Sequence, residues 1–197
     1  MNDTIAPKAG REGLRERKKR LAEQAITDAA LRLFAEKGYY ETSIQEIADA
    51  VMMSSRTFFR YFDSKEDILS GAIRAVQREG LRLAAECESN EPLKIALRRV
   101  FLHLAELYQQ QRDGLLARYR IAKQSSALAS LFLYAMLETE PELCAALAAR
   151  LEPEPDRSEL RFLVALHMTA LRVTIEEWLE NEESPPLSSL LEQRLIF

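Results

Sequence analysis

The sequence is poor in the residues from which metal, redox and nucleotide sites are commonly built. Its 197 residues include only 2 Cys, 2 His and 6 Gly. Cys87 and Cys144 lie far apart and form no C-x-x-C pair, and no Cys/His cluster has the spacing of a metal site. The chain also has no Gly-rich phosphate loop and no H-E-x-x-H or G-x-S-x-G motif. We therefore expect no catalytic residue, no metal ion and no cofactor, and a small helical enzyme stays an alternative that no motif supports.

Long hydrophobic runs are missing as well. The longest apolar stretch, residues 127–137, is too short to cross a bilayer and contains Ser130. The N-terminal residues have no apolar core of a secretory signal. Two cysteines without a pairing pattern fit a reducing compartment. We therefore expect a cytoplasmic protein with no membrane partner.

Charge is distributed unevenly along the chain, whose formal net charge is −4. Residues 1–65 carry 12 Lys/Arg and 10 Asp/Glu, whereas residues 66–197 carry 15 Lys/Arg and 21 Asp/Glu. Seven of the basic residues fall within residues 8–20. Such asymmetry favours a nucleic-acid-facing N-terminal end. A solvated, frayed terminus explains the charge alone equally well.

What the sequence has in abundance is helical periodicity. Ala, Leu, Glu and Arg dominate, and no alternating β-branched runs appear. Gly, Pro and capping residues divide the chain into about nine helices. The predicted helices cover residues 14–37, 55–61, 65–86, 93–111, 114–124, 126–151, 157–180 and 187–195, with one more beginning at residue 44. We therefore predict an all-α fold.

Residues 42–69 are the most informative part of the chain. Ser43 and Glu46 form a capping box, in which each side chain can bond to the backbone N–H of the other residue. Ser54 is a second N-cap candidate, in front of a short helix, and Ser64 repeats the capping pattern before a third helix. A short helix, a turn and a second short helix rich in Ser, Arg and Thr is the layout of a DNA-reading helix-turn-helix.

This stretch resembles the DNA-binding domain of the TetR family of one-component transcriptional regulators. The matching residues are Thr42, Ile47, Ala48, Ala50, Ser54, Thr57, Phe58, Arg60, Phe62, Ser64, Lys65, Glu66 and Leu69, with Ala29, Ala30, Leu31, Leu33, Phe34, Glu36, Lys37, Gly38 and Tyr39 upstream. The specific part covers about residues 14–69, and the rest resembles the family only in length and helical character. The resemblance implies a disordered basic arm over residues 1–13, a helix-turn-helix DNA-binding domain over 14–64, and a helical effector-binding and dimerisation domain over 65–197.

Two residues depart from the pattern of the family. Met52 stands in the turn where the family usually has Gly, a residue that commonly serves a positive φ. Either this turn has another geometry or Met52 tolerates that conformation. Phe59 stands where the family usually has Tyr, so any phosphate contact through that hydroxyl is missing.

The second helix of the motif carries the side chains expected to read DNA. Arg56 suits a guanine edge, and Thr57 suits a phosphate or a thymine methyl group. Thr42 and Lys65 lie at or beside helix starts, where backbone N–H groups favour an anion, and are expected to contact phosphate. The complete predicted set is Thr42, Ser54, Ser55, Arg56, Thr57, Phe59, Arg60, Tyr61 and Lys65, with Arg17 and Lys18 from the basic start of the first helix, whose charge adds sequence-independent attraction.

The C-terminal part is expected to bind a partner and a ligand. Residues 160–179 and the final helix are apolar over much of their circumference, and in the TetR family the last two long helices form a two-fold dimer interface. Packing within one subunit is the alternative. Polar or aromatic residues in apolar helical contexts are the weak candidates for a ligand pocket, although most such residues are ordinary core or surface positions: His103, Arg118, Tyr119, Tyr134, His167, Met168, Arg172 and Trp178.

The function that the sequence predicts is sequence-specific DNA binding by a transcriptional regulator. From the family resemblance we expect a homodimer that binds a palindromic operator on double-stranded DNA as a repressor, released by a small and largely apolar effector of unknown identity. A regulator that activates or needs no ligand, and a helical interaction module with a degenerate helix-turn-helix, remain alternatives.

Overall fold

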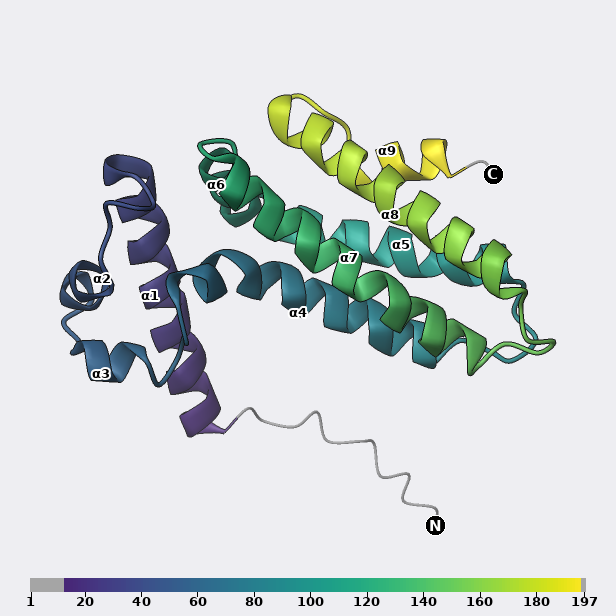
Figure 1. Ribbon diagram of the computed structural model, residues 1–197, viewed down its shortest axis with the longest axis horizontal. Coiled ribbons are helices and arrows are strands. Elements are labelled where there is room, and N and C mark those ends of the chain that lie inside the picture. The colour runs from purple at the N-terminus through teal and green to yellow at the C-terminus, as the bar shows by residue number, and fades with distance from the viewer. Residues whose placement is uncertain (1–12, 196–197) are drawn as a thin grey trace, which may run out of the picture. The chain divides into compact units, whose positions relative to one another are not determined.

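The computed structural model describes residues 13–195, and these residues form nine helices and no strand (Figure 1). The helices are α1 (Leu14–Lys37), α2 (Ile44–Ala50), α3 (Ser55–Phe58), α4 (Lys65–Ala85), α5 (Leu93–Gln110), α6 (Arg112–Ala122), α7 (Ser126–Ala148), α8 (Arg157–Glu180) and α9 (Leu187–Arg194). The predicted all-α fold is confirmed. The arm expected over residues 1–13 lies, except for Gly13, outside the described residues.

The chain divides into two compact units, residues 1–68 and 69–197, and the boundary falls inside α4. In the first unit, α1, α2 and α3 surround a small core in which apolar side chains from all three helices are fully buried. These side chains are Ile26, Ala30, Phe34, Ile47, Ala48 and Phe58. The predicted caps are present: Ser43 and Glu46 form the capping box of α2, and the Ser54 hydroxyl accepts from the Thr57 N–H. Local capping and a shared apolar face therefore fix the helix-turn-helix.

Gly38 ends α1 as expected, with φ 101°, and its N–H bonds to the Phe34 carbonyl. This φ lies in a region that L-residues rarely adopt, so the turn favours glycine. The Tyr39 ring then packs 5.0 Å from the ring of Phe34. This turn fixes the direction in which the chain enters α2.

The recognition helix α3 is shorter than predicted, ending at Phe58 and not at Tyr61. Beyond it the backbone tightens, because the Arg60 N–H bonds to the Thr57 carbonyl and the Tyr61 N–H to the Phe58 carbonyl, each three residues back. Periodicity predicted the inward direction of Phe58 correctly, but it does not distinguish an α-turn from these tighter turns.

In the second unit, α5 packs against α8 and α9, and α7 lies beside α8 (Figure 1). Most of the apolar surface predicted on α8 and α9 is buried by this packing. Leu163, Met168, Leu171, Trp178 and Leu179 of α8 are buried within the subunit, together with Leu187 and Leu191 of α9. Most of the apolar circumference of α8 therefore serves the core of its own subunit. The large side chain that remains exposed on α8 is Phe162.

No helix within residues 13–195 is both long enough and apolar enough to cross a membrane.

Candidate DNA-reading surface and ligand cavity

The outer side of α3 presents polar side chains that its own fold holds in place. The Ser55 hydroxyl donates to Gln45 Oε1 on α2 at 2.6 Å, and the hydroxyls of Ser54 and Thr57 lie 2.9 Å apart. Arg56 is exposed between them. Since its neighbours are tied to the helix-turn-helix, the Arg56 guanidinium projects from a rigid base, which suits a bidentate contact with a base edge.

A basic groove lies beside α3. It is lined by Leu14, Arg15, Glu16, Lys18 and Lys19 of α1, together with Arg60 and Tyr61. The Arg60 guanidinium donates to the Tyr61 hydroxyl at 2.8 Å. The fold thus brings four cationic side chains from two distant segments around one groove, as expected for a surface that follows a phosphate backbone. Arg17 does not line the groove but is exposed on the same first turns of α1.

Thr42 and Lys65 have structural bonds inside the first unit. The Thr42 side chain is buried, and its hydroxyl donates to the Gly38 carbonyl at 2.8 Å. The Lys65 ammonium donates to the carbonyls of Tyr39 and Thr42, each at 2.8 Å, and lies over the Tyr39 ring. The Lys65 side chain therefore joins the start of α4 to the loop before α2, whereas the buried Thr42 hydroxyl ties this loop to the end of α1. A phosphate contact by either residue stays a prediction.

The two residues that depart from the family pattern are both exposed. Met52 has φ 54° and is 96% exposed, so the turn keeps the left-handed conformation that usually favours glycine. Of the two readings of this turn, the structure therefore agrees with the one in which Met52 tolerates that conformation. Phe59 is 50% exposed, and its ring meets the buried Phe58 ring edge-on. The helix-turn-helix thus remains intact around both departures.

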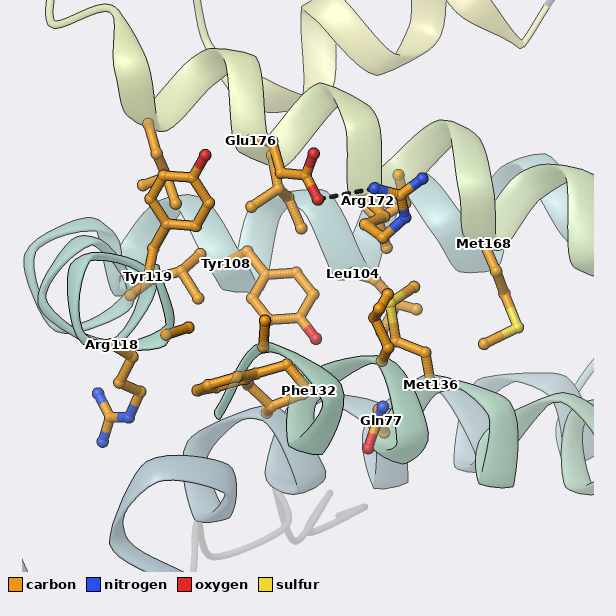
Figure 2. A pocket seen from close by; sticks show the side chains of 18 of the residues that line it. Gln77, Leu104, Tyr108, Arg118, Tyr119, Phe132, Met136, Met168, Arg172 and Glu176 are labelled. Carbon is orange, nitrogen blue, oxygen red and sulfur yellow. Dashed lines mark hydrogen bonds and ion pairs between the residues drawn. The ribbon is translucent and has the colours of Figure 1, made fainter. Parts of the chain in front are cut away.

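The second unit contains a cavity of about 520 Å³, bounded by α4 to α8 (Figure 2). Most of its wall is apolar, from Ile73, Phe101, Leu104, Leu115, Ala122, Ala129, Phe132, Leu133, Met136, Leu143, Met168, Leu171, Ile175 and Leu179. This size and lining are typical of a site for a small organic molecule.

Four of the eight predicted ligand residues line this cavity: Arg118, Tyr119, Met168 and Arg172. Arg118 is buried and donates to the carbonyls of Leu69 and Gly114. The other four do not line it. His103 lies between Glu79 and Glu106, Tyr134 is 65% exposed, and Trp178 is buried beneath the Arg112 guanidinium. His167 is buried, with Nδ1 2.7 Å from the Leu163 carbonyl, and burial lowers its pKa. Neither histidine lines the cavity.

Two ion pairs border the cavity. Arg172 Nη1 lies 2.7 Å from Glu176 Oε1 (Figure 2). Glu180 accepts from the Lys123 ammonium and from the Tyr119 hydroxyl, both at 2.7 Å. The Lys123 hydrogen bond, followed by that of Tyr119, lowers the pKa of the Glu180 carboxyl. Each acidic group thus has a basic partner, so the rim favours neither sign of ligand charge strongly.

Sequence reasoning missed several residues of the cavity, notably Gln77, Tyr108, Phe132 and Met136. Tyr108 lies on the apolar stripe of α5 with Leu97, Phe101 and Leu104. The stripe is real, but the cavity opens along it, and periodicity does not separate a side chain that faces a core from one that faces a cavity. No signal in a single sequence would have identified these four.

A helix-turn-helix beside a basic groove, followed in the chain by a helical body, defines the class of helix-turn-helix DNA-binding regulators. Residues 26–72 match the model of the bacterial regulatory proteins, tetR family, and residues 91–196 match the MftR C-terminal domain. The chain is 33% identical over 173 residues to the HTH-type transcriptional regulator TcmR of Streptomyces glaucescens, covering 84% of this chain and 76% of TcmR. The chain therefore belongs to the TetR family of DNA-binding transcriptional regulators.

Solved structures agree with this fold. A transcriptional regulator of the TerR/AcrR family from Aquifex aeolicus superimposes with a TM-score of 0.59 at 20% identity, over 89% of this chain and 99% of that chain. Thermus thermophilus FadR, a TetR family repressor in complex with lauroyl-CoA, gives a TM-score of 0.51 at 25% identity, over 88% of this chain and 91% of that chain.

Proposed function

We propose that this protein is a transcriptional repressor that binds a palindromic operator and is released from it by a small apolar molecule. The proposal of sequence-specific DNA binding rests on Arg56, which is exposed on α3. Beside α3 lies the basic groove lined by Arg15, Lys18, Lys19 and Arg60. Arginine at this place discriminates bases, whereas the groove contributes sequence-independent affinity. We assign the protein no catalytic role.

Operator binding by a homodimer follows from the small reach of a single α3. One short helix reads few base pairs, and a two-fold dimer reads two half-sites about one helical turn apart, ~34–36 Å, or a multiple of that distance. Exposed apolar side chains on the C-terminal helices support the dimer: Leu133, Tyr134 and Leu137 of α7 and Phe162 of α8. Most apolar side chains of α8 are buried within the subunit, as are Leu187 and Leu191 of α9. We therefore place the partner surface on the exposed apolar side chains of α7 and α8.

The effector site in this proposal is the apolar cavity of the second unit. Its lining favours a largely apolar molecule, and FadR of Thermus thermophilus, a relative in fold, holds lauroyl-CoA. If the ligand carries an acidic group, Arg172 is the best-placed arginine of the wall to meet it, since the Arg118 guanidinium is buried in bonds to backbone carbonyls. Ligand binding would lower operator affinity by a coupling of about 1–3 kcal/mol, roughly 5–150-fold.

Fluorescence anisotropy measures the affinity for DNA from the protein's own upstream region and so tests whether α3 binds a specific sequence. Replacing Arg56 by Ala is expected to weaken binding to that DNA about 10- to 100-fold and to leave binding to random DNA nearly unchanged, because a base contact is lost while the phosphate contacts remain. The thermal unfolding midpoint should not change, since Arg56 is exposed.

The matched control is Arg120→Ala, which removes the same charge from an exposed position on α6. This variant is expected to bind the upstream DNA as the unmodified protein does. Equal binding by all three proteins, or equal binding to specific and random DNA, would contradict sequence-specific reading by α3 and favour an interaction module with a degenerate motif.

A further inference from the structure

Tyr108 of α5 differs from every other polar residue at the wall of the cavity. Its side chain is 8% exposed, and its hydroxyl has no hydrogen-bond partner among residues 13–195. Each of the other polar side chains at the wall makes at least one bond within the protein. Gln77 and Thr139 donate to the Ala135 carbonyl, Arg118 to backbone carbonyls, Tyr119 and Lys123 to Glu180, and Arg172 to Glu176.

The Tyr108 hydroxyl points into the cavity and not into the core. Figure 2 shows the ring beside Phe132 with the oxygen directed toward the space near Met136. Phe101 and Leu104, on the same helix, line the cavity as well. The hydroxyl makes no bond within the described residues, and Phe would fill the same space in the fold. No fully buried side-chain polar atom of residues 13–195 lacks a partner, so this oxygen is reached by solvent in the cavity, and a ligand that displaced the solvent would have to satisfy it. Packing alone therefore does not account for a tyrosine here.

The protonation state of this group defines what it can recognise. Burial raises the pKa of Tyr108 well above its ordinary value, so the phenol stays neutral at physiological pH. A neutral phenol whose O–H has no acceptor in the protein is a hydrogen-bond donor available to a ligand. A ligand that displaced solvent from the cavity but offered no acceptor would leave the donor O–H of this hydroxyl unpaired.

We propose that Tyr108 is the residue that determines ligand specificity in the cavity, and that it selects apolar molecules carrying an acceptor oxygen within the buried part of their framework. A ketone, ester, ether or hydroxyl oxygen meets this requirement, whereas a plain hydrocarbon does not. This inference rests on the proposed function of the cavity as the effector site and narrows the class of effector. Sites built around a hydrogen bond reject analogues that lack it more strongly than apolar pockets reject a missing methylene.

Equilibrium dialysis of 9-fluorenone and fluorene against the full-length protein tests this role. The two compounds have nearly the same shape and differ by a carbonyl in place of a methylene group. The measured quantity is the ratio of their dissociation constants, so general differences in hydrophobicity cancel between protein variants. Tyr108→Phe is expected to shift the ratio against the ketone by about 3- to 10-fold, through loss of fluorenone affinity with fluorene affinity unchanged or raised.

Tyr119→Phe is the matched control, because it removes a hydroxyl at the cavity wall that already donates to Glu180. This variant is expected to keep the ratio of the unmodified protein. An unchanged ratio in Tyr108→Phe, or an equal shift in both variants, would overturn the assignment. The dialysis contains no DNA, so a failure of operator binding, which would contradict the proposed function, produces neither result.

Discussion

Met52 holds an unfavourable backbone conformation in the turn of the helix-turn-helix. It is the one non-glycine residue within 13–195 that has a positive φ. An L-residue in the left-handed region is less stable than glycine by roughly 1–2 kcal/mol, because Cβ crowds the following carbonyl oxygen. Met52 is 96% exposed and gains little from packing in return. The turn of the helix-turn-helix is therefore held by α2 and α3 against the preference of its own residue.

Replacing Met52 by Gly is expected to raise the free energy of unfolding by about 1 kcal/mol, after the greater backbone entropy of unfolded glycine is subtracted. Urea denaturation followed by circular dichroism measures the change. Met52→Ala removes the same exposed side chain but keeps Cβ, so its stability should match that of the unmodified protein. If both variants gained equally, the strain argument would be wrong.

At the same scale, single residues were the least predictable part of the site. Thr42 and Lys65 fit the family pattern, and their side chains donate to backbone carbonyls of the first unit. A sequence does not show which carbonyl oxygens lie within reach of such donors. Tyr108 looked like a core residue because burial and cavity lining share the same periodicity. Their roles depend on which distant segments meet, and a single sequence does not record that.

At the scale of elements, the capping box of α2 links sequence and structure most directly. The Ser43 hydroxyl accepts from the Glu46 N–H at 3.2 Å, and Glu46 accepts from the Ser43 N–H at 2.9 Å. The Glu46 carboxylate also accepts from the Lys37 ammonium at 2.6 Å, and this bond, followed by those from Ser43, lowers the Glu46 pKa to about 2. One carboxylate thus joins the end of α1 to the start of α2.

Ser43→Ala is expected to destabilise the protein by about 1 kcal/mol, because the Glu46 N–H in the first turn of α2 loses the hydroxyl that accepts its hydrogen bond. Ser43→Thr keeps the hydroxyl and should lose only a fraction of that amount. Thermal denaturation compares the two variants. A loss as large for Thr as for Ala would show that the hydroxyl is not the stabilising group.

Most helices were predictable because each begins and ends on a local signal. Gly38 ends α1, Asp156 accepts from the N–H groups of Ser158 and Glu159 to start α8, and Ser64 accepts from the Asp67 N–H in α4. The length of α3 was not predictable, since its tighter turns use bonds that no residue type marks. Pro141 did not end α7, which continues to Ala148.

The whole molecule combines a helix-turn-helix unit with a helical unit that contains an apolar cavity, and it belongs to the TetR family. The sequence indicated the class of protein because the helix-turn-helix motif is local, with its caps and core residues close together in the chain. The cavity was not predictable, because its wall combines residues from five helices of the second unit. The sequence showed that α8 and α9 are rich in apolar residues but not which of these side chains pack within the subunit: Leu187 and Leu191 of α9 are buried, whereas Phe162 of α8 is exposed.

The central claim is that the protein reads DNA sequence through two copies of α3. Selection of binding sites from a random duplex library, followed by sequencing, tests this claim most directly. If a two-fold dimer binds with one α3 in each half-site, an inverted repeat is enriched whose half-site centres lie one helical turn apart, ~34–36 Å, or a multiple of that distance. Enrichment of a single unrepeated site would contradict symmetric reading by a dimer, and no enrichment over the starting library would contradict sequence-specific binding altogether.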